Sequence, residues 1–137
     1  MLLLDTSVWI DLLADRRTSA VEFVLARAHS EELALSEMIY LEVLQGISLP
    51  RAFDKACSVL SAQVMVSPAQ GLESFEAAAR LYARARKLGL TVRTAVDCLV
   101  AQLALENGAL LVHNDRDFLA LARAEPRLNI YPSATLH

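Results

Sequence analysis

Four acidic residues interrupt or end apolar stretches, where a folded protein normally places hydrophobic side chains. They are Asp5 after residues 2–4, Glu42 within 38–44, Asp97 within 95–101 and Asp115 shortly after 110–112. A buried lone carboxylate is costly and takes up a proton unless a cation or another partner holds its charge. Because Mg2+ and Mn2+ prefer oxygen ligands, the four acids together predict a divalent metal site. Such a site suits phosphoryl chemistry, in which one or two ions stabilise the attacking and leaving oxygens and activate water.

The other chemistry-bearing residues form no rival catalytic set. The two cysteines, Cys57 and Cys98, stand far apart in apolar helical contexts and are typical of core residues. Of the three histidines, only His113 lies near one of the four acids in the sequence. The four glycines form none of the glycine-rich patterns that bind nucleotide phosphates.

The composition predicts one folded domain, residues 1–137, in the cytoplasm. A hydrophobic share of 55% leaves little room for disorder. The formal net charge of −3 argues against a nucleic-acid binder of the basic-patch kind, but not against one that binds phosphate through metal ions. There is no basic leader before a long apolar run, and polar residues break the longest apolar stretch. Neither a signal peptide nor a membrane helix is therefore expected.

Short apolar strands alternate with amphipathic helices along the chain. Strands are expected at 2–5, 33–35, 64–66, 110–112 and 128–131, and helices from 6 or 7, at 19–28, at 36–44, from 50, and at 71–88, 94–107 and 115–124. This order predicts an α/β fold with a parallel sheet covered on both faces. Ligands bind beyond the carboxyl ends of the strands in such sheets, and the four acids can converge there. In the long helix at 71–88, we expect Leu72, Phe75, Ala79 and Tyr82 to face inward.

Each of the four acids lies in a longer sequence motif. The motifs are Leu4-Asp5-Thr6-Ser7-Val8-Trp9-Ile10, then Ser36 with Glu42 and Gly46, then Thr91 to Asp97 with Ala101 and Ala104, and last Asn114-Asp115-Arg116-Asp117-Phe118. In this order they resemble the motifs of the PIN-domain ribonucleases, and in particular of the VapC-type toxins of bacterial toxin–antitoxin systems. The resemblance spans the whole chain.

The resemblance implies a three-layer α/β/α sandwich with a five-stranded parallel sheet. It also implies a Mg2+- or Mn2+-dependent endoribonuclease that cleaves cellular RNA, such as tRNA or rRNA, with a metal-activated water. Homodimers are common in the family, and a cognate antitoxin inhibits the toxin by placing its tail in the site. Asp5, Glu42, Asp97 and Asp115 carry over as catalytic metal ligands. The alternative hypothesis is a non-catalytic PIN-fold module that binds RNA or protein.

Further residues beside the acids are candidates for contacts with the metal ligands or the substrate. The set comprises Thr6, Ser7, Arg93, His113, Asn114 and Asp117. A hydroxyl from Thr6 or Ser7 is expected next to a ligand or a metal-bound water, and Arg93 is a candidate for phosphate contact. His113 stands where many relatives have Thr, and its imidazole could hydrogen-bond an acid or a phosphate. Asp117 competes with Asp115 for the fourth ligand position.

Overall fold

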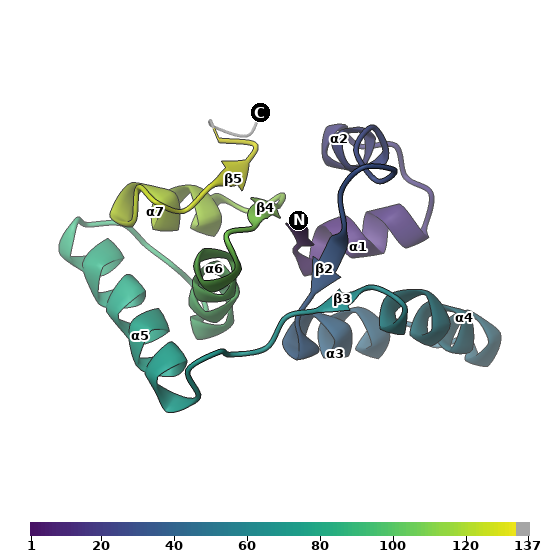
Figure 1. Cartoon of the computed structure of the whole chain (residues 1–137), viewed down its shortest axis with the longest axis horizontal. Coiled ribbons are helices and arrows are strands. Elements are labelled where there is room, and N and C mark those ends of the chain that lie inside the picture. The colour runs from purple at the N-terminus through teal and green to yellow at the C-terminus, as the bar shows by residue number, and fades with distance from the viewer. Residues whose placement is uncertain (134–137) are drawn as a thin grey trace.

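Residues 1–133, the part of the chain that the computed structural model describes, form seven helices and five strands, with one or two helices between successive strands (Figure 1). Their bounds are β1 (Leu2–Leu4), α1 (Thr6–Leu13), α2 (Ser19–Leu25), β2 (Leu33–Leu35), α3 (Glu37–Gln45), α4 (Pro50–Ser61), β3 (Val64–Met65), α5 (Leu72–Lys87), α6 (Ala95–Asn107), β4 (Leu110–Val112), α7 (Arg116–Ala124) and β5 (Ile130–Tyr131). Each expected strand and helix is present in the predicted order, with ends shifted by a few residues. Residues 134–137, which complete the predicted single domain 1–137, lie outside the described part. Within 1–133, no helix combines the length and the apolarity needed to cross a membrane.

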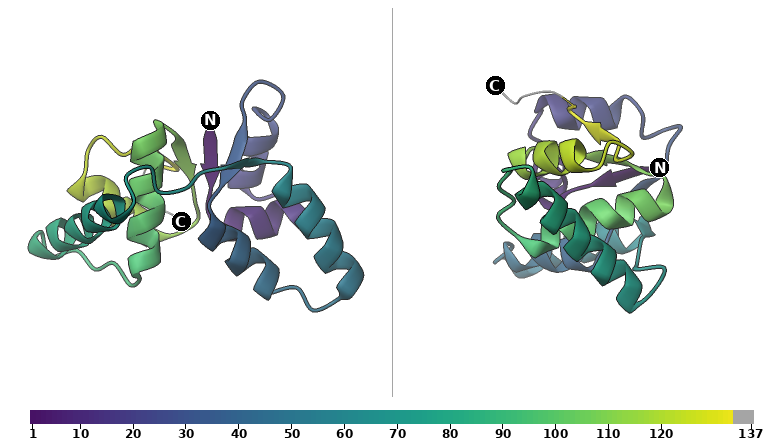
Figure 2. Two further views of the ribbon diagram at one scale, coloured as in Figure 1. Left: turned by 60° about the horizontal axis from the view of Figure 1, so that its bottom comes forward. Right: turned by 90° about the vertical axis from the view of Figure 1, so that its left-hand side faces the viewer.

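All five strands form one parallel sheet in the order β3-β2-β1-β4-β5. The central strand β1 pairs on both sides, with Leu2 opposite Leu33 in β2 and Leu110 in β4. Figures 1 and 2 show α1 to α4 on one side of the sheet and α5 to α7 on the other. Leu2, Leu3 and Leu4 are fully buried between these layers, as a strand covered on both faces requires. The predicted α/β sandwich with a five-stranded parallel sheet is confirmed.

Caps and turns bring two helix starts to the carboxyl edge of the sheet. Ser36, directly after β2, accepts a hydrogen bond from the backbone of Ile39 and so starts α3 at this edge. Gly108 ends α6 in the left-handed region (φ 58°), which glycine adopts at little cost, and the chain turns there into β4. Because α6 runs antiparallel to β4, its own start lies at the carboxyl edge. Thr94 caps that start by accepting a hydrogen bond from the backbone of Asp97.

The predicted inward face of α5 is wrong. The exposed fractions of Leu72, Phe75 and Tyr82 are 81%, 49% and 37%, and Ala79 is exposed as well. The buried residues of α5 form the neighbouring helical stripe, Ser74, Ala78, Leu81 and Ala85. Mostly small side chains on this stripe let α5 lie close against α6, since the distance between packed helices depends on the side chains at the contact. Both stripes contain apolar residues, so periodicity alone could not choose between them.

A groove lined mostly by apolar side chains lies between α5, α6 and the start of α3. Its lining includes Met38, Phe75, Ala79, Tyr82, Val96 and Leu99. The exposed aromatic rings of α5 therefore belong to a contiguous apolar surface rather than standing singly among polar residues. Surfaces of this kind mark interaction sites more often than singly exposed apolar side chains do.

We expect Leu81→Ala to lower the free energy of unfolding by about 2–5 kcal/mol, because the Leu81 side chain is buried against the core. Leu72→Ala, on the same helix, should change it by less than about 0.5 kcal/mol because Leu72 faces solvent. Urea unfolding followed by circular dichroism measures both variants. Equal losses for the two would support the inward face that the sequence predicted.

Candidate metal centre

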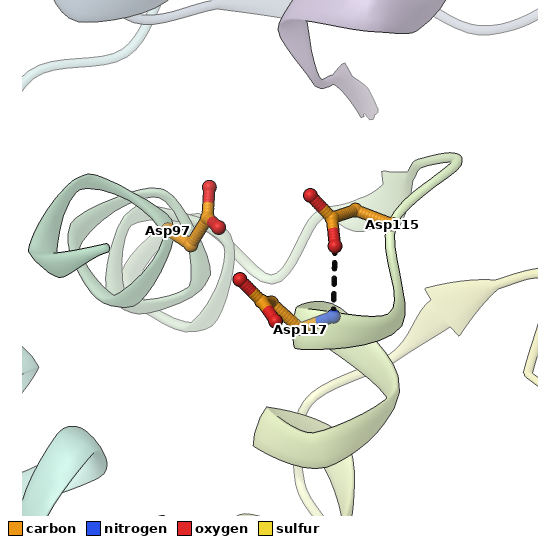
Figure 3. Close-up of side chains that lie close together, drawn as sticks. All are labelled: Asp97, Asp115 and Asp117. Atoms are coloured by element: carbon orange, nitrogen blue, oxygen red, sulfur yellow. Dashed lines mark hydrogen bonds between the residues drawn. The ribbon is translucent and has the colours of Figure 1, made fainter. Parts of the chain in front are cut away.

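Three carboxyl groups converge at the carboxyl edge of the sheet. Asp97 comes from the first turn of α6, Asp115 from the N-cap position of α7 and Asp117 from the first turn of α7 (Figure 3). One oxygen from each lies within 4.8 Å of the others. Asp117 is buried, whereas Asp97 and Asp115 are only partly buried and accessible from solvent. The three acids that β4, α6 and α7 position are therefore close enough to share one cation.

Asp5 follows directly on β1 at the same edge. Its backbone N–H donates to the carbonyl of Val112 at 3.0 Å, which holds it beside the end of β4. Asp5 occupies the N-cap position of α1, yet its side chain makes no capping hydrogen bond. Burial raises the pKa of Asp5 to about 6, and the charges of Glu42 and Asp115 contribute to the rise. The carboxyl group is thus not used for helix capping and lies near two other acids.

Glu42 approaches Asp5 from the middle of α3. The hydroxyl of Thr6 donates to Glu42 Oε1 at 2.8 Å and so joins α3 to the first turn of α1. Of the two hydroxyl groups expected near the metal ligands, that of Thr6 contacts an acid directly. The Ser7 Oγ is buried and has no hydrogen-bond partner within residues 1–133.

The negative charge at this edge exceeds what the surrounding protein compensates. Burial, together with the nearby charges of Asp5 and Asp115, raises the pKa of Asp97 to about 8. Acids that oppose one another's ionisation are stabilised in their charged form when a cation lies between them. Carboxylate oxygens are also the donors that hard divalent ions prefer. The donor set of this structure therefore fits a divalent metal ion.

Asp115 and Asp117, the two candidates for the fourth ligand, differ in their hydrogen-bond partners. Asp115 Oδ1 accepts from the backbone of Asp117 at 2.9 Å and from Arg93 Nη2 at 2.6 Å. Asp117 Oδ2 accepts from the backbone of Arg93 at 3.1 Å and from its Nε at 3.2 Å, and Nε lies 3.4 Å from Oδ1. Both oxygens of Asp117 are thus bonded to Arg93, whereas Asp115 takes part in these bonds through Oδ1 alone. Asp115 is the better placed of the two to accept an ion.

His113 is fully buried and connects the end of β4 to the chain after β5. Its Nε2 lies 2.8 Å from the carbonyl oxygen of Pro132, and its Nδ1 lies 3.1 Å from the backbone nitrogen of Asp115. A carbonyl only accepts and an N–H only donates, so both bonds require a neutral ring with its proton on Nε2. Burial also lowers the pKa of His113. The imidazole therefore positions the backbone of Asp115 and is shielded from a substrate phosphate, while the neighbouring Asn114 is exposed.

Two contacts at this edge leave no signal in the sequence. The Arg93–Asp117 pair joins residues 24 apart, and the His113–Pro132 bond joins residues 19 apart. Both depend on how α6, α7 and β5 lie against one another, which a local motif does not encode. Arg93, a candidate for phosphate contact, bonds in this structure to acids of the site instead.

The family model of the PIN domain matches residues 2–124, and the chain belongs to the PIN-domain family. Two of its relatives are VapC ribonuclease Mb1587 from Mycobacterium bovis and Ribonuclease VapC11 from Mycobacterium tuberculosis. Each is 38% identical over 130 residues, which cover 90% of this chain and 92% of the relative.

Solved structures with the same fold include VapBC2 from Rickettsia felis, bound to a DNA fragment from its promoter. Its TM-score is 0.72 at 16% identity, over 94% of this chain and 96% of that one. VapBC-1 from nontypeable Haemophilus influenzae has a TM-score of 0.71 at 20% identity, over 94% and 95% of the two chains. At these identities the likeness shows the fold alone.

We expect the metal-free protein to lose stability as the pH rises from 6.5 to 8.5. Through much of this range Asp97 holds a proton in the folded state, because its pKa is raised to about 8, whereas an aspartate of the unfolded chain, with a pKa of 3.8, holds none. The raised pKa stabilises the folded state most at low pH, and this contribution is lost as the pH passes the folded-state value. The loss should be about 1 kcal/mol after a discount for solvent screening.

Urea unfolding in EDTA across this pH range measures how steeply the free energy of unfolding falls with pH. Asp97→Asn should flatten it, whereas Asp54→Asn, an exposed acid on α4, should leave it unchanged. A slope that survives Asp97→Asn would contradict the assignment of the proton to Asp97.

Proposed function

We propose that this chain is a metal-dependent endoribonuclease toxin that cleaves cellular RNA, such as tRNA or rRNA, and is neutralised by a cognate antitoxin. The observation that carries the proposal is the cluster of Asp97, Asp115 and Asp117 at the carboxyl edge of the sheet, with Asp5 and Glu42 near enough for charges at this edge to act on one another. Membership of the PIN-domain family and the similarity to VapC ribonucleases support ribonuclease activity. Mg2+ is the proposed ion, with Mn2+ as a substitute.

Asp5, Glu42, Asp97 and Asp115 would hold the metal. When bound, the ion supplies positive charge to the phosphodiester and lowers the pKa of water enough for water to act as a nucleophile. The protein's own contribution is to fix the ligands in place. Thr6 holds Glu42 by its hydroxyl, and the His113 ring holds the backbone of Asp115. Such supporting hydrogen bonds orient ligands and contribute to metal affinity.

The partners follow from the same proposal. Solved structures of similar fold include VapBC2 from Rickettsia felis, VapBC-1 from nontypeable Haemophilus influenzae and a toxin–antitoxin complex from Klebsiella pneumoniae, which supports an antitoxin partner for this chain. An antitoxin tail that enters the metal centre would block it directly. A toxin that acts on cellular RNA works in the cytoplasm, which is the location we propose.

Asp97→Asn and Asp5→Asn should each slow RNA cleavage at least about 100-fold, the equivalent of about 2.7 kcal/mol of transition-state stabilisation. The substitution removes a charged metal ligand while preserving the shape of the side chain. Cleavage of purified tRNA and rRNA in Mn2+ buffer, resolved on a denaturing gel, measures the loss. Asp54→Asn on α4 is the matched control and should cleave as the wild type does. Full activity in both ligand variants would contradict the proposal.

A second measurement separates loss of the metal from loss of the fold. Mn2+ at about 100 times its Kd should stabilise the wild type by about 2.7 kcal/mol and raise its Tm, but should not stabilise Asp97→Asn to the same extent. The alternative, a module that binds RNA without cutting it, has a different signature. It would bind RNA with the acids replaced, with no cleavage and no stabilisation by Mn2+ in the wild type.

We propose further that the protein is a homodimer whose subunits meet at the apolar groove between α5 and α6. The groove contains Phe75 and Tyr82, whose exposure in a single subunit leaves a contiguous apolar surface in water. A two-fold symmetric dimer uses the same patch on both subunits, so one such patch is sufficient. The α5 residues that the sequence pattern assigned to the interior would then be buried by the partner.

Phe75→Glu should convert the dimer into a monomer, because a carboxylate in the interface would be buried without a partner. Sedimentation velocity measures the proportions of monomer and dimer. Leu25→Glu is the control, since Leu25 is an exposed leucine on α2 outside the groove, and it should remain dimeric. A wild type that sediments as a monomer would contradict the dimer, and a dimeric Phe75→Glu would place the interface elsewhere.

A further inference from the structure

Arg93 is the one basic side chain within residues 1–133 that forms ion pairs with the acids of the candidate metal centre. It lies two residues before the start of α6, and its side chain is 66% exposed. The Nη2 atom contacts Asp115 Oδ1 at 2.6 Å and Nε contacts Asp117 Oδ2 at 3.2 Å. The guanidinium therefore joins two acids of the centre, and one of them is a proposed metal ligand.

The two ends of this contact differ in strength and accessibility. Asp117 has a side-chain exposure of 6% and receives two donors from Arg93, the backbone N–H and Nε. Asp115 has a side-chain exposure of 28% and receives one donor from it, Nη2. A buried carboxylate with two donors is the firmer attachment, because breaking it would leave a buried charge unpaired. The contact with Asp115 can thus open while the contact with Asp117 holds.

A divalent ion at Asp115 and the guanidinium of Arg93 compete for one carboxylate. Both are cations, so they repel one another when they share Asp115, and the ion carries the greater charge. With Nε and the backbone still bonded to Asp117, the end of the guanidinium would then be free to turn outward. Arginine suits phosphate contacts because its planar donors match phosphate oxygens.

We propose that Arg93 is a tethered cation: it neutralises Asp115 in the metal-free protein, yields this carboxylate to the divalent ion, and then contacts the RNA backbone while anchored on Asp117. The inference rests on the proposed metal-dependent ribonuclease function. It gives Asp117 the role of a positioning residue for Arg93. It also explains why an arginine lies in a cation site that the enzyme must keep available.

The proposal predicts that loss of Arg93 has opposite effects on the affinity for the metal ion and on the affinity for RNA. Removing Arg93 removes a competitor, so the metal should bind more tightly, while RNA should bind more weakly. A residue that merely held Asp115 in place would have the reverse effect on the metal, since its loss would disorder a ligand. Asp115 keeps two other supports without Arg93, namely the His113 ring on its backbone and its own cap bond to the backbone of Asp117.

Isothermal titration of the full chain with Mn2+ alone, without RNA, tests the first effect. Arg93→Ala should lower the Kd for Mn2+ about fivefold, a factor in keeping with an exposed ion pair. Arg116→Ala is the matched control, because Arg116 lies between Asp115 and Asp117 in sequence, is exposed, and forms no ion pair with them. Arg116→Ala changes the net charge of the protein by the same amount as Arg93→Ala, and it should leave the Kd for Mn2+ close to that of the wild type.

Cleavage kinetics on purified RNA at saturating Mn2+ test the second effect. Arg93→Ala should raise KM several-fold with little change in kcat. The slope of log RNA affinity against log salt concentration should become shallower by about one, the amount expected for the loss of one phosphate contact. Arg93→Lys keeps the charge, but its single ammonium cannot reproduce the paired contacts of Nε and Nη2. It should also bind Mn2+ more tightly than the wild type, and it serves as the test variant if Arg93→Ala does not fold.

The outcomes separate the inference from the function on which it rests. If Arg93→Ala binds Mn2+ as tightly as the wild type or more weakly, the tethered cation is overturned. The proposed function still stands in that case, because the wild type binds the metal. Wild-type protein that binds no Mn2+ overturns both. Tighter Mn2+ binding in both Arg93→Ala and Arg116→Ala overturns the specific role of Arg93 and leaves only an effect of net charge.

Discussion

Mutual repulsion among carboxyl groups at one edge of the sheet is the constraint on which the rest of the site depends. The apolar core overcomes it: β1 is fully buried, and the bond from Asp5 to the Val112 carbonyl fixes this acid beside the end of β4. Asp97 cannot move away either, because its backbone belongs to the first turn of α6, which Thr94 caps. Burial is the main cause of the raised pKa values of Asp5 and Asp97, and the charges of the neighbouring acids add to it. Burial elsewhere holds together charges that a divalent ion would stabilise, as expected at functional sites.

The acids at this edge differ in the hydrogen bonds that hold them. Asp115 caps α7 and is held by His113, so its position is set by bonds to two elements. Asp117 is committed to Arg93. Asp5 is different, because it stands at the start of α1 without a capping hydrogen bond. Besides burial, its pKa is affected by the backbone of Thr6, which lowers it, and by the charges of Glu42 and Asp115, which raise it. A buried carboxyl group whose charge is opposed by two other acids is better explained by a bound cation than by local structure.

Local signals in the sequence were sufficient for the elements and for the edge at which the acids meet. Apolar runs marked the strands, and the helices expected from 36 and from 94 begin one residue after those positions, where Ser36 and Thr94 are the caps. Long-range contacts were not predictable. The Thr6–Glu42 bond joins residues 36 apart, and no pattern in either segment specifies it. The predicted buried face of α5 was wrong for a related reason. Which stripe of α5 is buried depends on how closely α6 approaches, and this is a property of the two helices together.

The way α5 packs against α6 has a consequence for the metal centre. By burying mainly small side chains against α6, the chain leaves Phe75 and Tyr82 outside its own core. The groove they form is completed by Val96 and Leu99 of α6, the helix whose first turn carries Asp97. A subunit seated in this groove would therefore pack against the residues on either side of Asp97 in the sequence.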